Sequence, residues 1–139
     1  MSDFTKAFYD TLVGDATLTA MLSEYAENTP AVFTVAPVPE DAELPYIITE
    51  GEIANLPFDT KSLNGREVIR DIRCYTAASG SASDVEEIAE RVRALFHWQS
   101  ISIDNYEDSF FTEVSNILTA DEDGVYGRIV TVRMIAMEA

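Results

Sequence analysis

The chain of 139 residues is long enough to build one domain around a hydrophobic core, and its hydrophobic fraction of 47% argues against a disordered protein. The net charge of −16, from 25 acidic and 9 basic residues, argues against a protein that grips nucleic acid, which needs Lys and Arg to neutralise phosphates. No apolar run approaches the ~20 residues that span a bilayer, and the first residues lack the features of a signal peptide, so we expect a cytoplasmic protein.

The N-terminal segment predicts two helices in succession. Apolar residues recur at helical spacing in both, and Asp3 and Asp15 stand where a side chain can cap each helix. Gly14 lies between them, and we expect it to take the left-handed conformation that ends a helix. The apolar positions are Phe4, Phe8, Leu12, Leu18, Met21 and Leu22.

Two short strands are predicted in the next part of the chain. Residues 31–36 form an apolar run between Pro30 and Pro37, which suits an edge strand because proline cannot donate a backbone hydrogen bond. Residues 44–50 form a second strand that follows an acidic loop, and Pro45 is placed acceptably near its start.

Residues 51–65 are expected to form a long loop between two strands, because they mix apolar side chains with Pro57, asparagines and glycines. A tight hairpin loop has ~2–5 residues, and longer loops in small domains are often functional. The apolar residues Leu56, Phe58 and Leu63 indicate that something covers this loop. Two interpretations are open: the loop folds back over its own domain, or it forms an arm that packs on a neighbouring subunit.

A strand is predicted at residues 66–76. Alternation places Val68, Arg70, Ile72 and Cys74 on one face. The opposite face carries Ile69, Asp71, Arg73 and Tyr75. Neither face is purely apolar, so both faces are expected to have partners.

The clearest predicted element is the helix that ends at Phe96. Ser83 and Glu86 are expected to form a capping box at its start, and Glu87 and Arg91 are placed for an ion pair one turn apart. A continuous apolar stripe predicts that this helix lies flat on a sheet. The stripe contains Val85, Ile88, Ala89, Val92, Leu95 and Phe96.

Three further strands are predicted at residues 101–103, 110–120 and 125–137, with Asp123 and Gly124 forming a hairpin turn between the last two. One face of the last strand is fully apolar, so this strand should be central; that face contains Val130, Val132, Met134 and Ala136. The pattern indicates an α+β fold in one domain over residues 1–139. We expect a mostly antiparallel sheet with helices packed on one face and a long protruding inter-strand loop.

Residues with catalytic or metal-binding chemistry are scarce. Cys74, the single cysteine, is expected to be a small buried hydrophobe, and it allows no internal disulfide. His97 is expected to cap or pack at the end of a helix, and one Cys with one His makes no structural zinc site. Residues 121–124 lack the spaced ligands of a calcium loop. No catalytic residue, cofactor or metal is predicted, and a binding or assembly role is favoured over an enzyme.

Several motifs follow one another in an order that is moderately specific. They are the opening Phe8 to Leu12, Asp15 to Leu18 and Leu22, then Leu44 to Ile48 after an acidic loop, Asp59 to Lys61 before Gly65 to Glu67, the strand ending at Tyr75, and the helix Asp84 to Phe96. Together they resemble the phage tail-completion (tail-terminator) family over nearly the whole chain.

This resemblance implies a subunit of a hexameric ring that caps the head-proximal end of a tail tube. Such a ring stops tube growth and joins the tail to the head-connector or stopper protein, and DNA passes through its channel without specific binding. The resemblance further implies a virion protein of a phage, prophage or gene transfer agent, assembled in the bacterial host cytoplasm. No enzymatic activity, cofactor or membrane partner is implied.

A closed ring needs one contact repeated by rotation, so each copy must supply two complementary surfaces. The expected contact combines the loop at residues 52–64 with the basic strand after it. The acidic first third of a neighbour is the expected partner, because no Lys or Arg occurs between Lys6 and Lys61; alternatively, this acidic region is a solvated surface that aids solubility. The candidate interface residues are Ile53, Leu56, Phe58, Lys61, Leu63, Arg66, Arg70 and Arg73.

Two rival functions remain open at this point. One is another neck protein, a head-tail stopper or adaptor, which would bind the connector rather than the tail tube. The other is a small cytoplasmic enzyme or ligand-binding domain, which would need a concave pocket with convergent polar groups.

Overall fold

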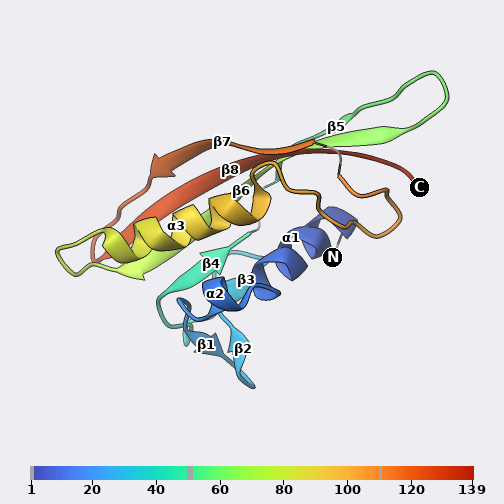
Figure 1. Ribbon diagram of the computed structural model, residues 1–139. Coiled ribbons are helices and arrows are strands. Elements are labelled where there is room, and N and C mark those ends of the chain that lie inside the picture. Colours follow the sequence, from blue (N-terminus) through green and yellow to red (C-terminus); the bar gives the residue numbers. More distant parts are fainter. Residues whose placement is uncertain (1, 50–51, 110) are drawn as a thin grey trace.

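The protein is built on one main β-sheet with helices on one of its faces (Figure 1). The computed structural model describes residues 2–49, 52–109 and 111–139. The helices are α1 (Asp3–Val13), α2 (Ala16–Thr19) and α3 (Ser83–Phe96). The strands are β1 (Glu24–Tyr25), β2 (Thr29–Pro30), β3 (Val32–Phe33), β4 (Tyr46–Ile48), β5 (Glu52–Pro57), β6 (Gly65–Ala77), β7 (Phe111–Thr119) and β8 (Val125–Met137). The predicted α+β class with a mostly antiparallel sheet is confirmed.

The long strands β6 and β8 form the centre of the sheet, and each is 13 residues long. They pair antiparallel from Gly65 opposite Met137 to Ala77 opposite Val125. β7 pairs with the other side of β8, so the predicted central position of β8 is confirmed. Alternate residues of β8 face the helices, and that face is apolar and fully buried; it contains Val130, Val132, Met134 and Ala136.

Two strands share the opposite edge of β6. β4 pairs with residues 73–75, and β5 pairs with residues 66–70. The predicted protruding segment between two strands is confirmed, but its first half is itself the strand β5, which leaves a turn at residues 58–64. This strand could not be predicted from the sequence. Most residues of β5 are exposed on both faces, so they show no alternation of apolar and polar side chains, and the strand forms because its backbone pairs with β6.

The hydrophobic core lies between the helices and one face of the sheet. α3 packs against β6, β7 and β8, and it therefore lies flat on the sheet as predicted. The ring of Phe8 in α1 stacks on the ring of Phe96 in α3 at a centroid distance of 5.0 Å, which joins the two helices. Burying one such side chain contributes about 1.5–3 kcal/mol, so this layer supplies most of the stability. None of the helices in the described part of the chain has the length and apolar character needed to cross a membrane.

The ends of α1 differ from the expectations. Ser2, rather than Asp3, caps this helix by accepting a hydrogen bond from the Thr5 amide at 3.1 Å. Gly14 was expected in the left-handed conformation, but its φ is −76° because its amide still donates to the Asp10 carbonyl at 2.9 Å. The right-handed backbone thus continues into the turn before α2.

The caps of α2 and α3 give one confirmation and one correction. Asp15 caps α2 as predicted, with its carboxylate accepting a hydrogen bond from the Leu18 amide at 2.8 Å. The predicted capping box of α3 is wrong, because Ala82 occupies the N-cap position without a side-chain bond. Ser83 lies one residue inside the helix, and its amide donates to the hydroxyl of Ser81 at 3.3 Å instead.

Two predicted strands are shorter than expected or absent. β3 covers only part of residues 31–36, and it pairs parallel to β4 at the sheet edge. Residues 101–103 form no strand, although Ile101 and Ile103 are buried, because an extended segment can place alternate side chains in the core without pairing. Parts of the predicted loop and strands lie outside the described residues, namely Glu50, Gly51 and Phe110.

Candidate functional site

The most prominent feature outside the core is a hairpin that extends beyond the rest of the sheet (Figure 1). We call it the arm and define it as residues 52–66, which comprise β5, the turn and the start of β6. β5 pairs with β6 from Glu52 opposite Arg70 to Pro57 opposite Arg66, so the arm is a continuation of the central ladder.

The arm carries a group of exposed apolar side chains. The exposed fractions are 60% for Ile53, 49% for Leu56, 37% for Phe58 and 53% for Leu63. Several large exposed apolar side chains in one projecting segment make that segment a candidate interaction site. Because the arm extends away from the domain, the structure favours the interpretation as an arm over a loop folded back on its own domain.

Hydrogen bonds give the turn of the arm a defined shape. The Thr60 amide donates to the Leu63 carbonyl at 2.8 Å, and the Leu63 amide donates to the Thr60 hydroxyl at 3.2 Å. The Asp59 carboxylate accepts a bond from the Gly65 amide at 3.2 Å. A Cβ atom on Gly65 would lie 2.6 Å from the Phe58 carbonyl oxygen, so this crossing needs glycine. An arm ordered in advance loses little conformational entropy on docking.

Arg70 anchors the base of the arm within its own chain. Its side chain is 2% exposed, and its Nε donates to the Thr49 carbonyl at 3.0 Å and to the Thr49 hydroxyl at 3.1 Å. Its Nη2 also donates to that carbonyl, and its guanidinium carbon lies 5.5 Å from the centre of the Phe8 ring. A Glu52 carboxylate oxygen is 4.0 Å from Nη1. The sequence-based placement of Arg70 at a subunit surface is therefore corrected, because this residue faces the helix side of β6.

The other predicted contact residues fall into two places. Lys61 is exposed in the turn of the arm, and Arg66 is partly exposed beside that turn, opposite Pro57, so both lie in the arm with the apolar side chains. Arg73 is exposed seven positions further along β6, which corresponds to about 23 Å of strand. The structure therefore gathers the arm residues and separates Arg73 from them.

A second surface feature lies at the far end of β6 from the arm. It is a cleft of ≈ 540 Å³ that we call the cleft from here on. The register of β4 against β6 sets Tyr46 opposite Tyr75 and Ile48 opposite Arg73, on the sheet face that the helices leave open. The main lining residues are Pro37, Val38, Tyr46, Ile48, Tyr75 and Glu122. Sequence reasoning missed the cleft, because its walls come from segments that the fold alone brings together.

Aromatic contacts give the cleft a firm apolar wall. The Tyr46 ring meets the Phe33 ring at a centroid distance of 5.9 Å and the Tyr75 ring at 5.8 Å, both near edge-to-face. Burial raises the pKa of the Tyr46 hydroxyl, and nearby Tyr75 and Glu122 raise it further.

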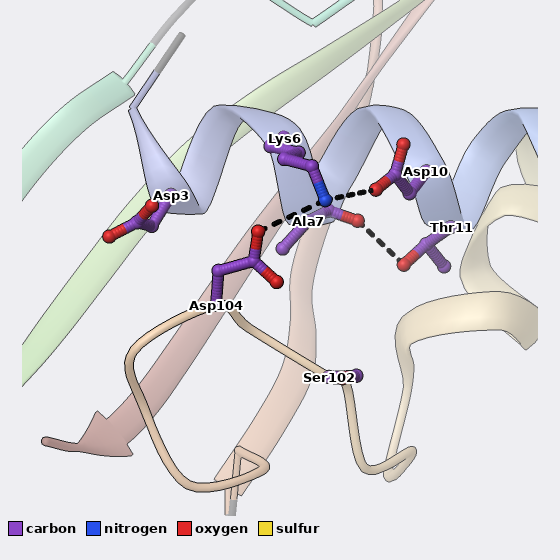
Figure 2. A pocket seen from close by; sticks show the side chains of 7 residues that line it. All are labelled: Asp3, Lys6, Ala7, Asp10, Thr11, Ser102 and Asp104. Atoms are coloured by element: carbon purple, nitrogen blue, oxygen red, sulfur yellow. Dashed lines mark hydrogen bonds and ion pairs between the residues drawn. The ribbon is translucent and has the colours of Figure 1, made fainter. Parts of the chain in front are cut away.

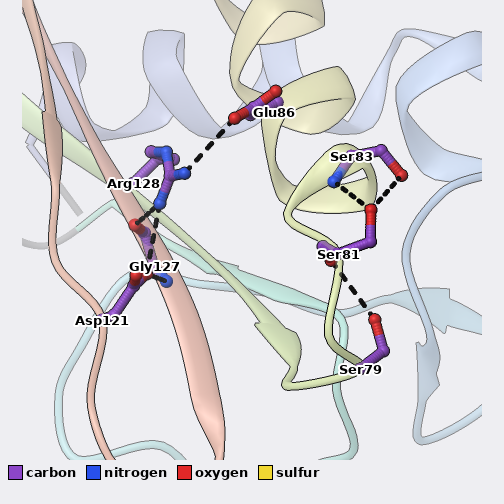
Figure 3. A network of polar contacts seen from close by, with 7 residues as sticks. All are labelled: Ser79, Ser81, Ser83, Glu86, Asp121, Gly127 and Arg128. Carbon is purple, nitrogen blue, oxygen red and sulfur yellow. Dashed lines mark hydrogen bonds and ion pairs between the residues drawn. The ribbon is translucent and has the colours of Figure 1, made fainter.

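Polar contacts hold the turn between β7 and β8 against α3 (Figure 3). Arg128 is central to them: its Nη1 lies 3.1 Å from Asp121 and donates to the Gly127 carbonyl at 2.8 Å. Its Nη2 lies 3.5 Å from Glu86 of α3. A separate set of serine hydrogen bonds orders the loop before α3, formed by Ser79, Ser81 and Ser83. The acidic turn at residues 121–124 is thus fixed in place.

A pocket of ≈ 250 Å³ beside α1 is polar, but its groups are already paired (Figure 2). Lys6 lies 3.1 Å from the carboxylates of both Asp10 and Asp104, and hydrogen bonds to these two acids raise the pKa of its ammonium group. The Thr11 hydroxyl donates to the Ala7 carbonyl at 2.7 Å, not to a base. The Lys6 ammonium group and the Thr11 hydroxyl are thus held by neighbouring groups of the chain.

The remaining candidates for reactive chemistry serve the fold. Cys74 is buried, and burial raises the pKa of its thiol to about 12, which leaves it protonated at neutral pH. The Nδ1 atom of His97 accepts a hydrogen bond from the Val114 amide at 3.1 Å, a structural role beside β7. Among residues 2–49, 52–109 and 111–139, no group of three His, Cys, Asp or Glu residues is placed to hold a metal ion.

The fold is similar to that of two chains in solved structures. A chain of the virion of a native gene transfer agent particle aligns with a TM-score of 0.76 and 16% identity, covering 96% of this chain and 93% of that chain. The gp17 protein of bacteriophage SPP1 aligns with a TM-score of 0.52 and 20% identity, covering 93% of this chain and 85% of that chain. The sequence matches no protein-family model and no curated protein. At these identities the likeness shows a shared fold.

Proposed function

We propose that this chain is a virion structural protein of a long-tailed phage or phage-like particle, in which a ring of copies caps the head-proximal end of the tail tube. The observation that carries this proposal is the likeness of fold to a chain of a gene transfer agent virion, which spans 96% of this chain. The likeness to the SPP1 gp17 protein supports the same class of particle. The position at the tube end rests on the resemblance of the sequence motifs to the tail-completion family.

The arm supplies a contact of the kind that a ring requires. A ring closes when one surface of each copy meets a different surface of the next copy and rotation repeats this contact. The arm projects from its own domain and exposes Ile53, Leu56 and Leu63, so it serves as one of the two surfaces. The proposed ring is a hexamer that stops tube growth and offers its other side to the head-connector or stopper protein.

The charge of the chain suits a ring through which DNA passes. A net charge of −16 on each copy repels phosphates, so DNA crosses the channel without being held. The proposed role is mechanical, with no enzymatic step and no cofactor. Copies assemble in the bacterial cytoplasm and remain in the virion.

Tail tubes polymerised from the tube protein of the same particle test this proposal. Adding the intact chain should shorten the tubes and place a ring-shaped cap at one end, as seen by electron microscopy. A variant in which the two-residue turn Asn-Gly replaces residues 59–64 keeps the pairing of β5 with β6; it is the matched control and should leave tube length unchanged. Tubes that keep growing beside the intact chain would contradict the proposal. Binding to the connector without binding to tubes would favour the alternative, a head-tail stopper.

A further inference from the structure

We propose that the arm of one copy docks in the cleft of the next copy, so that the arm and the cleft are the two halves of the ring contact. This inference rests on the proposed ring function, and it identifies the cleft as the surface to which the arm of the neighbouring copy binds. The occupant of the cleft is thus a second copy of this chain, and its contacting side chains are those at the outer part of the arm.

Geometry excludes the docking of the arm in the cleft of its own chain. Arg66 beside the turn of the arm and Tyr75 in the cleft lie nine positions apart on the same strand, which is about 30 Å. β6 is paired along its whole length with β8, so it cannot fold back on itself. A contact between the two features must therefore join different copies, and it is head-to-tail, which is the class of contact that closes rings.

The apolar surfaces of the two features complement each other. The outer part of the arm presents the aliphatic side chains Leu56 and Leu63, each about half exposed. The cleft offers the rings of Tyr46 and Tyr75 with Val38 beside them. Docking removes both surfaces from water, which favours association in proportion to the apolar area buried.

The charges at the two features also complement each other. Lys61 is exposed in the turn of the arm, and no Lys or Arg lies between it and Lys6; the acid of that turn, Asp59, accepts the hydrogen bond from the Gly65 amide. The lining of the cleft includes Glu122, and Asp123 lies in the same turn, whereas Asp121 of that turn is paired with Arg128. Arg73 is the cation of the lining, so Lys61 is expected to meet the cleft on the side of Glu122. Opposite charges at the rim set the register of the contact and speed association.

Disulfide cross-linking tests the pairing directly. The double variant Leu63→Cys with Val38→Cys places one thiol on the arm and one in the cleft of every copy. Cys74 stays unreactive because burial raises the pKa of its thiol to about 12. Oxidation of the assembled protein should give a ladder of covalent multimers in denaturing gels, ending at the ring size.

The matched control is Leu63→Cys with Ala94→Cys, since Ala94 is exposed on α3, on the helix side of the molecule. A ladder from the first pair alone supports the inference. A ladder from both pairs, or from neither, while light scattering shows that the wild-type chain forms rings, overturns the inference and leaves the proposed function standing. A wild-type chain that forms no ring even on tail tubes overturns both.

Charge reversal gives an independent measurement that does not rely on thiol geometry. Lys61→Glu should weaken self-association about 5-fold, as expected for one exposed ion pair. Adding Glu122→Lys to the same chain should restore the wild-type affinity, because the reversed pair forms between copies. Failure of the second change to restore association in sedimentation experiments would count against the pairing.

Discussion

At the scale of single residues, Arg70 connects β6 with two segments that are distant in sequence, the region from Thr49 to Glu52 and α1. Its guanidinium bonds to Thr49, lies 4.0 Å from Glu52 and covers the ring of Phe8. Arg70→Ala should lower the free energy of unfolding by about 2 kcal/mol, because it leaves the Thr49 carbonyl buried without these donors. Urea denaturation measures this loss. Arg73→Ala, on the same strand but exposed, is the control and should change stability by less than about 0.5 kcal/mol.

A second residue-scale prediction concerns the ion pair between Asp15 and Arg91, whose closest atoms are 2.6 Å apart. The hydrogen bond from Arg91 holds the pKa of Asp15 below its ordinary value of 3.8, despite partial burial. A carboxylate with a lowered pKa adds stability above its ordinary pKa, and that stability is lost as the pH falls through the lowered value.

Asp15→Asn tests this pair, because asparagine keeps the cap of α2 but carries no charge. The variant should unfold more easily than the wild type at pH 7, and the difference should vanish as the pH falls below about 4. Thermal unfolding over a series of pH values measures it. A difference that stays constant down to acidic pH would assign the effect to the cap and not to the charge.

The same pair shows why residue-scale contacts are hard to predict. The sequence places Glu87 one turn before Arg91, which predicts a pair within α3. In the structure Arg91 instead reaches Asp15, which is 76 positions away. Local spacing is visible in a sequence, whereas the packing of α2 against α3 is a property of the whole fold.

At the scale of elements, the outer turn of the arm is expected to be dispensable for folding. It lies beyond the last pair of β5 and β6, Pro57 with Arg66, so a deletion that replaces residues 59–64 with the two-residue turn Asn-Gly keeps this ladder and should leave the free energy of unfolding nearly unchanged. The same deletion should abolish ring formation and leave a folded monomer. Light scattering measures the oligomer, and far-ultraviolet circular dichroism checks the fold.

A milder variant separates the shape of the arm from its surface chemistry. Leu56→Ser with Leu63→Ser keeps the turn hydrogen bonds of the arm but removes much of its apolar surface. This variant should also remain monomeric. An unchanged oligomer in the deletion would exclude the arm from the subunit contact.

Elements with a strong internal pattern were predictable, and elements defined by their neighbours were not. α3 and β8 show continuous apolar faces, so their type, extent and burial followed from periodicity. β5 forms because the backbone of β6 has an edge free for pairing, and the sequence of residues 52–57 does not indicate that such an edge lies beside it. The cleft depends on the same kind of information, since it forms only where β4, β6 and the turn at residues 121–124 meet.

At the scale of the whole molecule, charge opposes assembly while apolar contact favours it. Copies that each carry −16 repel one another over about 30 Å at 0.01 M salt but only about 8 Å at 0.15 M. Ring formation should therefore strengthen as salt is raised through this range. Sedimentation velocity at several salt concentrations measures the change. Steady weakening with added salt would mean that attractive ion pairs dominate the contact.

The placement of the arm and the cleft on one strand has a consequence for the circumference of the assembly. In the proposed ring, the ladder of β6 and β8, paired over 13 residues, fixes the distance between the arm and the cleft of each copy. Lengthening both strands by two residues would keep every side chain on its face and would separate the two ends by about 7 Å. The twist added by those residues would also turn one end relative to the other. In the proposed ring, the length of this one β-ladder would therefore help to set how many copies close the circle.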